Sequence, residues 1–316
     1  MAIDYVEVTI GNSSTPIRLN YDSASGTWSN STTAPNFSTK NSTLAPDGYV
    51  PVSITAYDTA GNHTTIGTSS MTFGENLKLR VEEKDKPVIA FTSPSSGSYQ
   101  KDKSVTVEFT VKDNNGMTSG YSGVNSDSIV LKDGSTTLSG VTKTAITGGY
   151  RCTYTGNFTD GVHTLTATAS DNDDNAAEAK SVSFTVDTVK PNLTNVKIND
   201  SSESTVDTNQ LTFTITGNTD DAGVKTGITV SIAINGVPIQ GTITPNSDGS
   251  FSKTISVEDE GSYTITITAT DMAGNDSTTV SKTVNVTTTA PIFELVSLSP
   301  NPATANGFFT ITVKVR

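Results

Sequence analysis

The sequence predicts an all-β protein built from consecutive β-sandwich domains. Three observations support this fold class. The composition of the 316 residues is 33% hydrophobic and rich in Thr, Ser, Val, Asn and Gly, which favours short strands joined by polar turns. One strand-turn-strand segment occurs three times in the same register, and the prolines that follow the copies stand about 100 residues apart.

The repeated segment begins with an acidic residue and Gly and ends with Asp, at Asp47–Asp58, Asp160–Asp171 and Glu260–Asp271. Aliphatic side chains alternate in it with Thr or Ser, so one strand face should contact a core and the other water. The side chains expected to point inward are Val52, Ile54 and Ala56; Leu165, Ala167 and Ala169; and Ile265, Ile267 and Ala269.

A turn follows each copy, and a second alternating strand follows the turn. The turns read Asp-Thr-Ala-Gly-Asn, Asp-Asn-Asp-Asp-Asn and Asp-Met-Ala-Gly-Asn, and the next strands are clearest at 181–186 and 280–286. Small residues that tolerate positive φ allow the chain to reverse there. The middle turn, 171–175, lacks the Ala-Gly pair, which leaves its hairpin geometry open.

The prolines at the joints set the predicted domain size. Pro87, Pro191 and Pro291 stand about 100 residues apart, which is the size of an immunoglobulin-like sandwich. We therefore predict tandem immunoglobulin-like domains in an elongated rod, with short and stiff joints because proline keeps the entry strand extended. The predicted domains are 1–85, 86–188, 189–287 and a partial domain, 288–316.

Further strands are expected inside the domains, at 105–111 and 211–215, and Asn235-Gly236 predicts a type I′ hairpin. The first domain is short and carries a polar stretch, Ser29–Ser42, that reads as a loop; as a terminal repeat it should be atypical, a cap or an attachment module. The last segment supplies about two strands, which either open a fourth domain or pair with another chain.

Charge and cysteine content exclude several classes. The net charge of -12 disfavours nucleic acid and anionic membranes as partners, and no segment is long enough for membrane insertion. Cys152 is the single cysteine, so no disulfide joins the sheets, and in a strand-like run it reads as a small buried hydrophobe. The first ten residues alternate like a strand and show no secretory signal, which indicates cytoplasmic assembly or a fragment.

The strand ending in Asp-x-Ala-Gly-Asn, the strand after it and the following Asp-x-x-x-Pro resemble bacterial Ig-like and cadherin-like repeats of adhesins, surface-layer proteins and phage virion proteins. The resemblance extends to about residue 286. A second resemblance is to Ig-like proteins of prophage tail regions in Gram-positive bacteria. It rests on the opening strand, 2–10, on the closing segment, 298–302, and on the missing signal.

The resemblance implies a non-enzymatic structural or binding component of a phage tail or virion, located on a virion or tail-like particle. Many copies would make weak contacts with the host cell surface. Its partners would be other virion or surface proteins and cell-wall or surface glycans. The alternative is a bacterial cell-surface adhesin or surface-layer stalk fragment, and a third hypothesis is a glycan-active enzyme whose catalytic domain is not in this sequence.

No catalytic constellation is visible in the sequence. His63 and His163 fall at different repeat positions, which argues against a shared catalytic base or zinc pair. We therefore expect no enzyme activity and no cofactor other than calcium.

Calcium is the cofactor to consider, because the acidic residues of the middle turn and the next joint offer hard oxygen ligands. The candidate ligands are Asp171, Asp173, Asp174 and Asp187. The competing interpretation is that Asp and Asn occupy this turn for backbone reasons.

Aromatic residues and a possible covalent cross-link are two further candidate features of the sequence. Trp28 and Tyr121 are candidate sugar-stacking aromatics, with burial as anchors of the sandwich as the alternative. A buried Lys, Asn and acid could also form an intramolecular isopeptide bond, which would lower the intact mass by one ammonia.

Overall fold

The computed structural model describes residues 2–40, 43–113, 120–222 and 227–316. The described chain is almost entirely strand and turn; its helical segments are two 3-10 turns, Gly74–Leu77 and Ser126–Ser128. Among these residues no helix has the length and apolar character needed to cross a membrane. The predicted all-β fold of tandem immunoglobulin-like domains is confirmed, while its elongated-rod arrangement stays a prediction.

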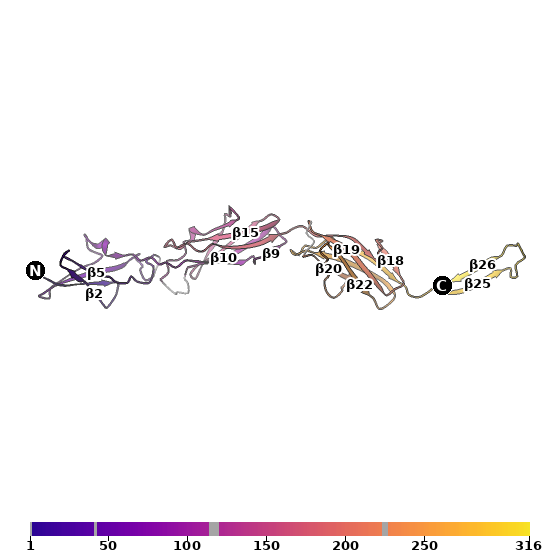
Figure 1. The fold of residues 1–316 in the computed structure, drawn as a ribbon, viewed down its shortest axis with the longest axis horizontal. Coiled ribbons are helices and arrows are strands. Elements are labelled where there is room, and N and C mark those ends of the chain that lie inside the picture. The colour runs from indigo at the N-terminus through magenta and orange to yellow at the C-terminus, as the bar shows by residue number, and fades with distance from the viewer. Residues whose placement is uncertain (1, 41–42, 114–119, 223–226) are drawn as a thin grey trace. The chain divides into compact units, whose positions relative to one another are not determined.

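The chain divides into two compact units, residues 1–187 and 188–316. The first unit contains the first and second predicted domains, and the second unit contains the third domain and the C-terminal segment (Figure 1). The predicted boundaries at 85/86 and 287/288, within these units, stay predictions.

The second domain is a sandwich of two sheets, one in the order β13-β14-β10-β8 and the other in the order β12-β11-β15-β16-β9. Figure 1 labels β10 in one layer and β15 in the other. The strands are β8 (Val88–Ser93), β9 (Ser98–Gln100), β10 (Ser104–Lys112), β11 (Val130–Asp133), β12 (Thr136–Thr137), β13 (Thr142–Ile146), β14 (Gly149–Asn157), β15 (Gly161–Thr168) and β16 (Lys180–Val186).

The core of the second domain lies between these sheets. In β10, Val105, Val107, Phe109 and Val111 are buried while the residues between them are more exposed, as a half-buried strand requires. The predicted inward residues Leu165, Ala167 and Ala169 are also buried. The alternating pattern therefore gives the correct face of both strands.

Cys152, on β14, belongs to the same core and is fully buried. Burial raises the pKa of its thiol to about 11, so the thiol stays protonated at neutral pH. The prediction of a small buried hydrophobe is confirmed.

The third domain repeats this architecture with a three-stranded sheet, β17-β19-β22, and a five-stranded sheet, β18-β24-β23-β20-β21. Ile265, Ile267 and Ala269 are fully buried, as predicted. The strands are β17 (Asn192–Ile198), β18 (Thr205–Thr208), β19 (Thr212–Asp220), β20 (Thr229–Ile234), β21 (Val237–Pro238), β22 (Ser250–Ser256), β23 (Gly261–Thr270) and β24 (Val280–Val286).

The turn between β20 and β21 has the geometry that the sequence predicts. Asn235 and Gly236 have φ angles of 49° and 82°, which are the two positive values of a type I′ hairpin. The two strands pair directly, Ile234 with Val237 and Ala233 with Pro238.

The first domain differs from the other two. Its main sheet has the order β2-β1-β5-β6 with β7 also paired to β5, and a separate two-stranded sheet joins β3 and β4. Its strands are β1 (Ile3–Ile10), β2 (Ile17–Arg18), β3 (Asn20–Asp22), β4 (Thr27–Ser29), β5 (Val50–Asp58), β6 (His63–Ile66) and β7 (Lys78–Leu79).

The predicted burial of Val52, Ile54 and Ala56 is wrong. All three are half-buried, and so are Ser53, Thr55 and Tyr57 on the other face of β5. The reason is the lack of a large opposing sheet among the described strands; the buried apolar residues of this domain are few, namely Val6, Ala45, Val50, Leu77 and Val81.

The expected Ser29–Ser42 loop has no regular structure from residue 30 to residue 40, while residues 41 and 42 lie outside the described residues. Ser38 and Thr39 are nevertheless buried. Thr39 N–H donates to Val81 O (2.9 Å), and Val81 N–H donates to Thr39 Oγ1 (3.1 Å). The loop is thus tied to the segment that enters the second domain.

The C-terminal segment is a two-stranded antiparallel hairpin of β25 (Phe293–Ser299) and β26 (Thr310–Val315). Every residue of both strands is exposed.

Replacing Phe109, which is fully buried, by Ala should destabilise the second domain by about 3–5 kcal/mol because it leaves a cavity between the sheets. The matched control is Val162→Ala on β15, where the side chain is 74% exposed and the loss should stay below about 0.5 kcal/mol. Calorimetric unfolding of the full chain measures both. Equal effects of the two changes would contradict the assignment of the core.

Candidate functional site

The Asp-x-x-x-Asn turn is held by one carboxylate. Asp171 is fully buried, and its Oδ1 accepts the backbone N–H groups of Asp173 (2.9 Å) and Asn175 (2.8 Å). Its Oδ2 accepts the Asn175 side-chain amide (2.8 Å). The carboxylate therefore replaces the backbone contacts that a tight turn leaves unmade.

The same arrangement occurs in the other two domains. Asp58 accepts from Asn62 N and Nδ2 at 2.9 Å, and Asp271 accepts from Asn275 N and Nδ2 at 2.8 Å. Hydrogen bonds from Asn62 hold the pKa of Asp58 below its ordinary value. The Asp and Asn of the repeat are thus explained by the backbone of the turn.

The middle turn, whose geometry the sequence left open, has the same form. Asp174 takes a φ of 65° at the position where Gly61 and Gly274 have φ angles of 87° and 86°. Asp tolerates this left-handed conformation better than most residues. The change of sequence therefore does not change the turn.

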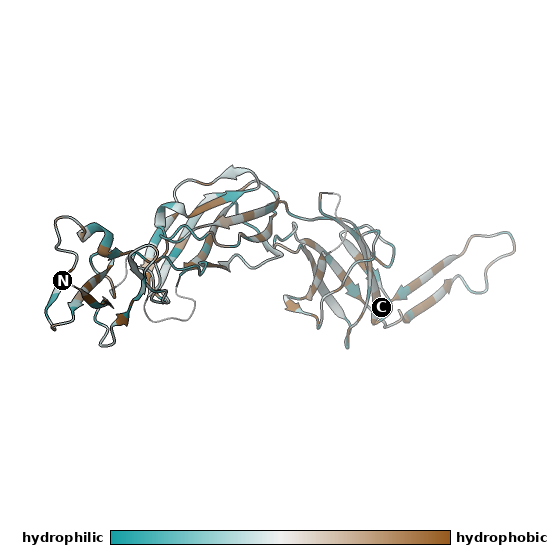
Figure 2. Cartoon of the chain, turned by 60° about the vertical axis from the view of Figure 1, so that its left-hand side comes forward, coloured by the Kyte–Doolittle hydropathy of each residue, from teal (hydrophilic) through white to brown (hydrophobic). Residues whose placement is uncertain are grey.

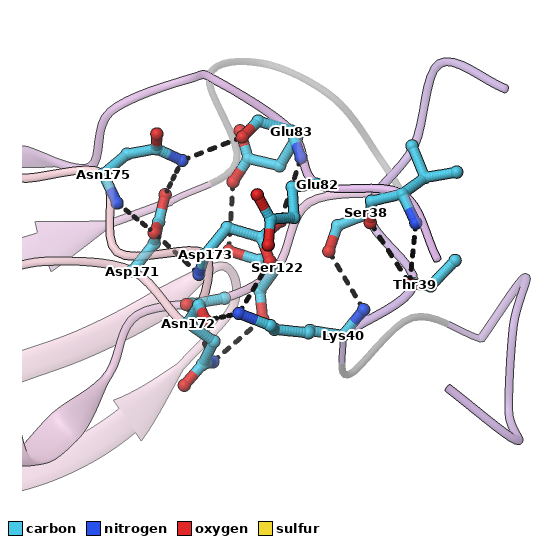
Figure 3. Close-up of polar contacts among 12 residues, drawn as sticks. Ser38, Thr39, Lys40, Glu82, Glu83, Ser122, Asp171, Asn172, Asp173 and Asn175 are labelled. Carbon is cyan, nitrogen blue, oxygen red and sulfur yellow. Dashed lines mark hydrogen bonds and ion pairs between the residues drawn. The ribbon is translucent and has the colours of Figure 1, made fainter. Parts of the chain in front are cut away.

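Three acidic side chains meet beside this turn. Oxygen atoms of Glu83, Asp113 and Asp171 all lie within 4.8 Å of one another, with Asp113 and Asp171 buried and Glu83 half-buried. Glu83 comes from the segment before β8, Asp113 directly follows β10, and Asp171 lies three residues after the end of β15. The site is thus formed where the linker reaches the end of the second sandwich (Figure 3).

Neutral groups supply the other contacts of these carboxylates. Ser122 Oγ donates to Glu83 Oε1 (3.0 Å), and Gly123 N–H donates to Asp113 Oδ2 (2.7 Å). None of these donors carries a charge, so the negative charges are stabilised only in part.

Burial raises the pKa of Glu83 to about 7; the Ser122 hydrogen bond opposes this rise, and Asp113 and Asp171 add to it. Burial likewise raises the pKa of Asp113 to about 6, with a contribution from Asp171. Charged carboxylates packed together out of water disfavour the ionised form of each other. Near neutral pH Glu83 and Asp113 therefore bind protons more readily than isolated carboxylates do.

The turn also contacts the segments that come from the first domain. Lys40 Nζ donates to Asn172 O (2.8 Å) and lies 3.4 Å from Asp173 Oδ1, and Glu83 N–H donates to Asp173 Oδ2 (2.9 Å). Asn175 Nδ2 donates to Glu83 O as well (3.0 Å). Figure 3 shows Lys40 and Glu83 approaching the turn from two different segments.

We call this set of contacts the acidic joint: Lys40, Glu83, Asp113, Ser122, Asp171, Asn172, Asp173 and Asn175. Its three converging carboxylates match the hard oxygen ligands that calcium takes, with the Ser122 hydroxyl as a neutral oxygen nearby. The arrangement can bind a divalent cation; it offers no histidine or thiolate ligand among these residues.

The structure separates the four candidate calcium ligands. Asp171 belongs to the three-carboxylate group, and the buried Asp173 pairs with Lys40 and the Glu83 backbone. Asp174 is exposed on the turn. Asp187 is half-buried after β16, where its N–H donates to Gln100 O (2.9 Å), and it is not a member of this group.

Sequence reasoning missed Glu83 and Asp113. A usable signal existed for Asp113, because an acidic residue follows the corresponding strand in the third domain as Asp221, which is also buried. Glu83 gave no such signal, since it stands in a charged linker, Glu82-Glu-Lys-Asp-Lys86, whose members look alike.

The two aromatic candidates are in different environments. Trp28, on β4, packs on Tyr21 with ring centroids 5.0 Å apart, and Tyr21 is 55% exposed. Tyr121 is half-buried beside a pocket of about 320 Å³ that Tyr150 and Asn172 also line. The structure therefore does not bring Trp28 and Tyr121 together into one stacking platform.

His163 makes more contacts than an ordinary strand residue. Nδ1 lies 2.7 Å from Asp133 Oδ2, and Nε2 lies 2.8 Å from Thr159 O. Burial lowers its pKa, but the hydrogen bonds to Thr159 and Asp133 and the charge of Asp133 together raise it, so the net shift is upward.

Lys282 is the buried lysine of the described residues. Its amine donates to two main-chain carbonyls, Ser202 O (2.6 Å) and Glu203 O (2.8 Å). These partners explain its burial without an isopeptide bond to an asparagine.

Comparison with known proteins finds one family model, described as "Glucodextranase, domain B", that matches residues 191–288. This segment is the third domain, which is thus similar to that domain of glucodextranase. None of the curated proteins matches the chain.

Several solved structures are similar in part. The fibronectin(III)-like modules of Clostridium thermocellum CbhA align with 63% of this chain and 93% of their own at 21% identity and a TM-score of 0.42. The D00-D0 domain of intimin aligns with 61% of this chain and 98% of its own at 16% identity and a TM-score of 0.29. Yersinia pseudotuberculosis adhesin InvE aligns with 63% and 58% at 16% identity and a TM-score of 0.26.

The raised pKa values of Glu83 and Asp113 predict a pH effect. Because the folded state binds protons more tightly than the unfolded state, this stabilisation is complete below the ordinary carboxyl pKa and is lost as pH rises through about 6 to 7. In chelator, the melting temperature of the first unit should therefore fall between pH 5 and pH 8.

Glu83→Gln should flatten this pH dependence, whereas Glu82→Gln, at the exposed neighbouring residue, should leave it unchanged. His163 shifts stability in the same direction but is retained in both variants, so the difference between them reports the acidic joint. Parallel pH profiles for the two variants would contradict the assignment.

Proposed function

We propose that this chain is a non-catalytic stalk of a bacterial cell-surface protein, in which immunoglobulin-like domains hold and display a binding surface. The observation that carries the proposal is the acidic joint. Lys40 and Glu83 are bound to the Asp173 side chain of the second domain, so the first domain is fastened by side chains as well as by the linker. A fastened joint suits a protein whose task is to hold domains in place.

We further propose that calcium binds at the acidic joint. Glu83, Asp113 and Asp171 would hold the ion with their carboxylates, and the ion would supply positive charge where the three negative charges converge. These residues connect the linker to two strand ends of the second sandwich. Binding would therefore stiffen the joint under extracellular calcium and loosen it in chelator.

A melt of the full chain in calcium and in chelator tests this site at pH 7.5. Binding stabilises the folded state by about 2.7 kcal/mol when free calcium is 100 times the dissociation constant, so the transition of the first unit should move to higher temperature. Asp113→Asn should abolish the shift, and Glu82→Gln should retain it. An unchanged midpoint in wild type would end the calcium proposal.

Weak contacts between single copies and their ligands would become effective when many copies are displayed together. A cell surface that displays many copies converts weak binding to cell-wall or surface glycans into useful avidity. The other carrier, which the sequence resemblance implies, is a phage tail or virion, where the same domains would contact the host.

Immunogold labelling of the native protein separates the two carriers. We expect gold on intact cell walls. If gold labels only particles in an induced lysate and no cell walls, the stalk belongs to a virion, and the cell-surface proposal is wrong.

A further inference from the structure

The C-terminal hairpin has one continuous apolar face. The strands pair in antiparallel register with Val296 opposite Val313 and Leu298 opposite Ile311, so these side chains project from the same side of the sheet. Phe293 pairs with Val315 beyond the irregularity in β25. All six residues are between 46% and 71% exposed: Phe293, Val296, Leu298, Ile311, Val313 and Val315.

The opposite face is mainly polar. It carries Ser297 opposite Thr312 and Ser299 opposite Thr310, with one apolar residue, Leu295, opposite Lys314. Glu294 pairs with Lys314 (2.5 Å) and Arg316 (3.5 Å) near the strand ends. Figure 2 shows hydrophobic residues along both arms of the hairpin. This is the pattern of a sheet that covers a core on one side.

The complete domains show how such a pair is normally covered. The first long strands of the second and third domains pair in the same way, β8 with β10 and β17 with β19. In both, a further strand pairs with the outer edge, β14 or β22, and apolar side chains such as Phe109 and Phe213 are buried in a core shared with a second sheet. The hairpin therefore has the architecture of half a sandwich whose opposing layer is not supplied by the described residues.

Charge favours a second copy as the occupant. The whole chain carries -12, but residues 288–316 contain one acidic residue and two basic ones, a net charge of +1 that is largely paired within the hairpin. Two hairpins can therefore approach without the repulsion that two acidic surfaces would produce.

The apolar area is also sufficient. Six half-exposed apolar side chains offer roughly 500 Å² per copy, hence roughly 1,000 Å² when two copies meet, which reaches the lower range of specific interfaces. An isolated two-stranded hairpin is marginally stable in water, and exposed apolar patches of this size commonly mark interaction sites.

We propose that two copies of this chain associate by packing the apolar faces of their β25–β26 hairpins against each other. Each hairpin then supplies the layer that covers the other, and a two-fold axis relates the copies because the same face is used by both. This proposal does not depend on the acidic joint or on calcium.

Sedimentation equilibrium of the full chain tests the interface at concentrations from 1 to about 100 μM. The matched variants are Val313→Glu and Thr312→Glu. Both changes add one negative charge to β26, but Val313 lies on the apolar face and Thr312 on the polar face. Wild type and Thr312→Glu should approach twice the 33.0 kDa monomer mass, whereas Val313→Glu should weaken dimerisation at least about 100-fold by burying a charge.

A second pair of variants, each with one new cysteine, distinguishes loss of the interface from unfolding of the hairpin. Val313→Cys is close in volume to the native residue and should form a disulfide-linked dimer under mild oxidation, while Thr312→Cys should not; Cys152 is buried and should not contribute. A wild-type chain that remains at 33.0 kDa throughout, or equal behaviour within each pair, would overturn the proposal and assign the face to a different occupant.

Discussion

The rest of the joint depends on the hydrogen bonds between Asp171 and Asn175. They hold the turn of the second domain, they bring the turn to the linker, and Asp171 also belongs to the three-carboxylate group. The Asp171 carboxylate holds the turn through the Asn175 backbone and amide, and the same amide reaches the Glu83 carbonyl of the linker. Closing the turn also directs Asp173 toward Lys40. One local hydrogen-bond pattern thus fixes a hairpin and at the same time provides the attachment point for the first domain.

The third domain uses the same device. Asn275 donates its amide to Asp271 and also to Val189 O (3.3 Å), in the segment that precedes β17. In both units the asparagine of the turn therefore reaches the chain that enters its own sandwich. This explains why the repeat retains Asp and Asn while the three residues between them vary.

The negative charges of the acidic joint lower its stability. Packing Glu83, Asp113 and Asp171 together destabilises their ionised forms, and the surrounding donors are neutral. A structure built this way is more stable when these carboxylates are protonated, and the proposed calcium ion would act in the same direction. The stability of the joint should therefore depend on pH, whereas the two sandwich cores are apolar.

Features that depend on neighbouring residues could be predicted from the sequence. Alternation of Val, Ile and Phe with Thr defines the strand faces of the second and third domains because successive side chains point to opposite sides, and Asn235-Gly236 defines its turn because both residues accept positive φ. Which acidic side chains come together could not be predicted, because it depends on how distant segments fold against one another. Asp113 and Asp171 lie 58 positions apart in the chain, and Glu83 could not be distinguished from its charged neighbours before the linker was placed beside the turn. The same holds for the half-buried β5, whose pattern matches the other repeats, because burial depends on an opposing sheet and not on the strand alone.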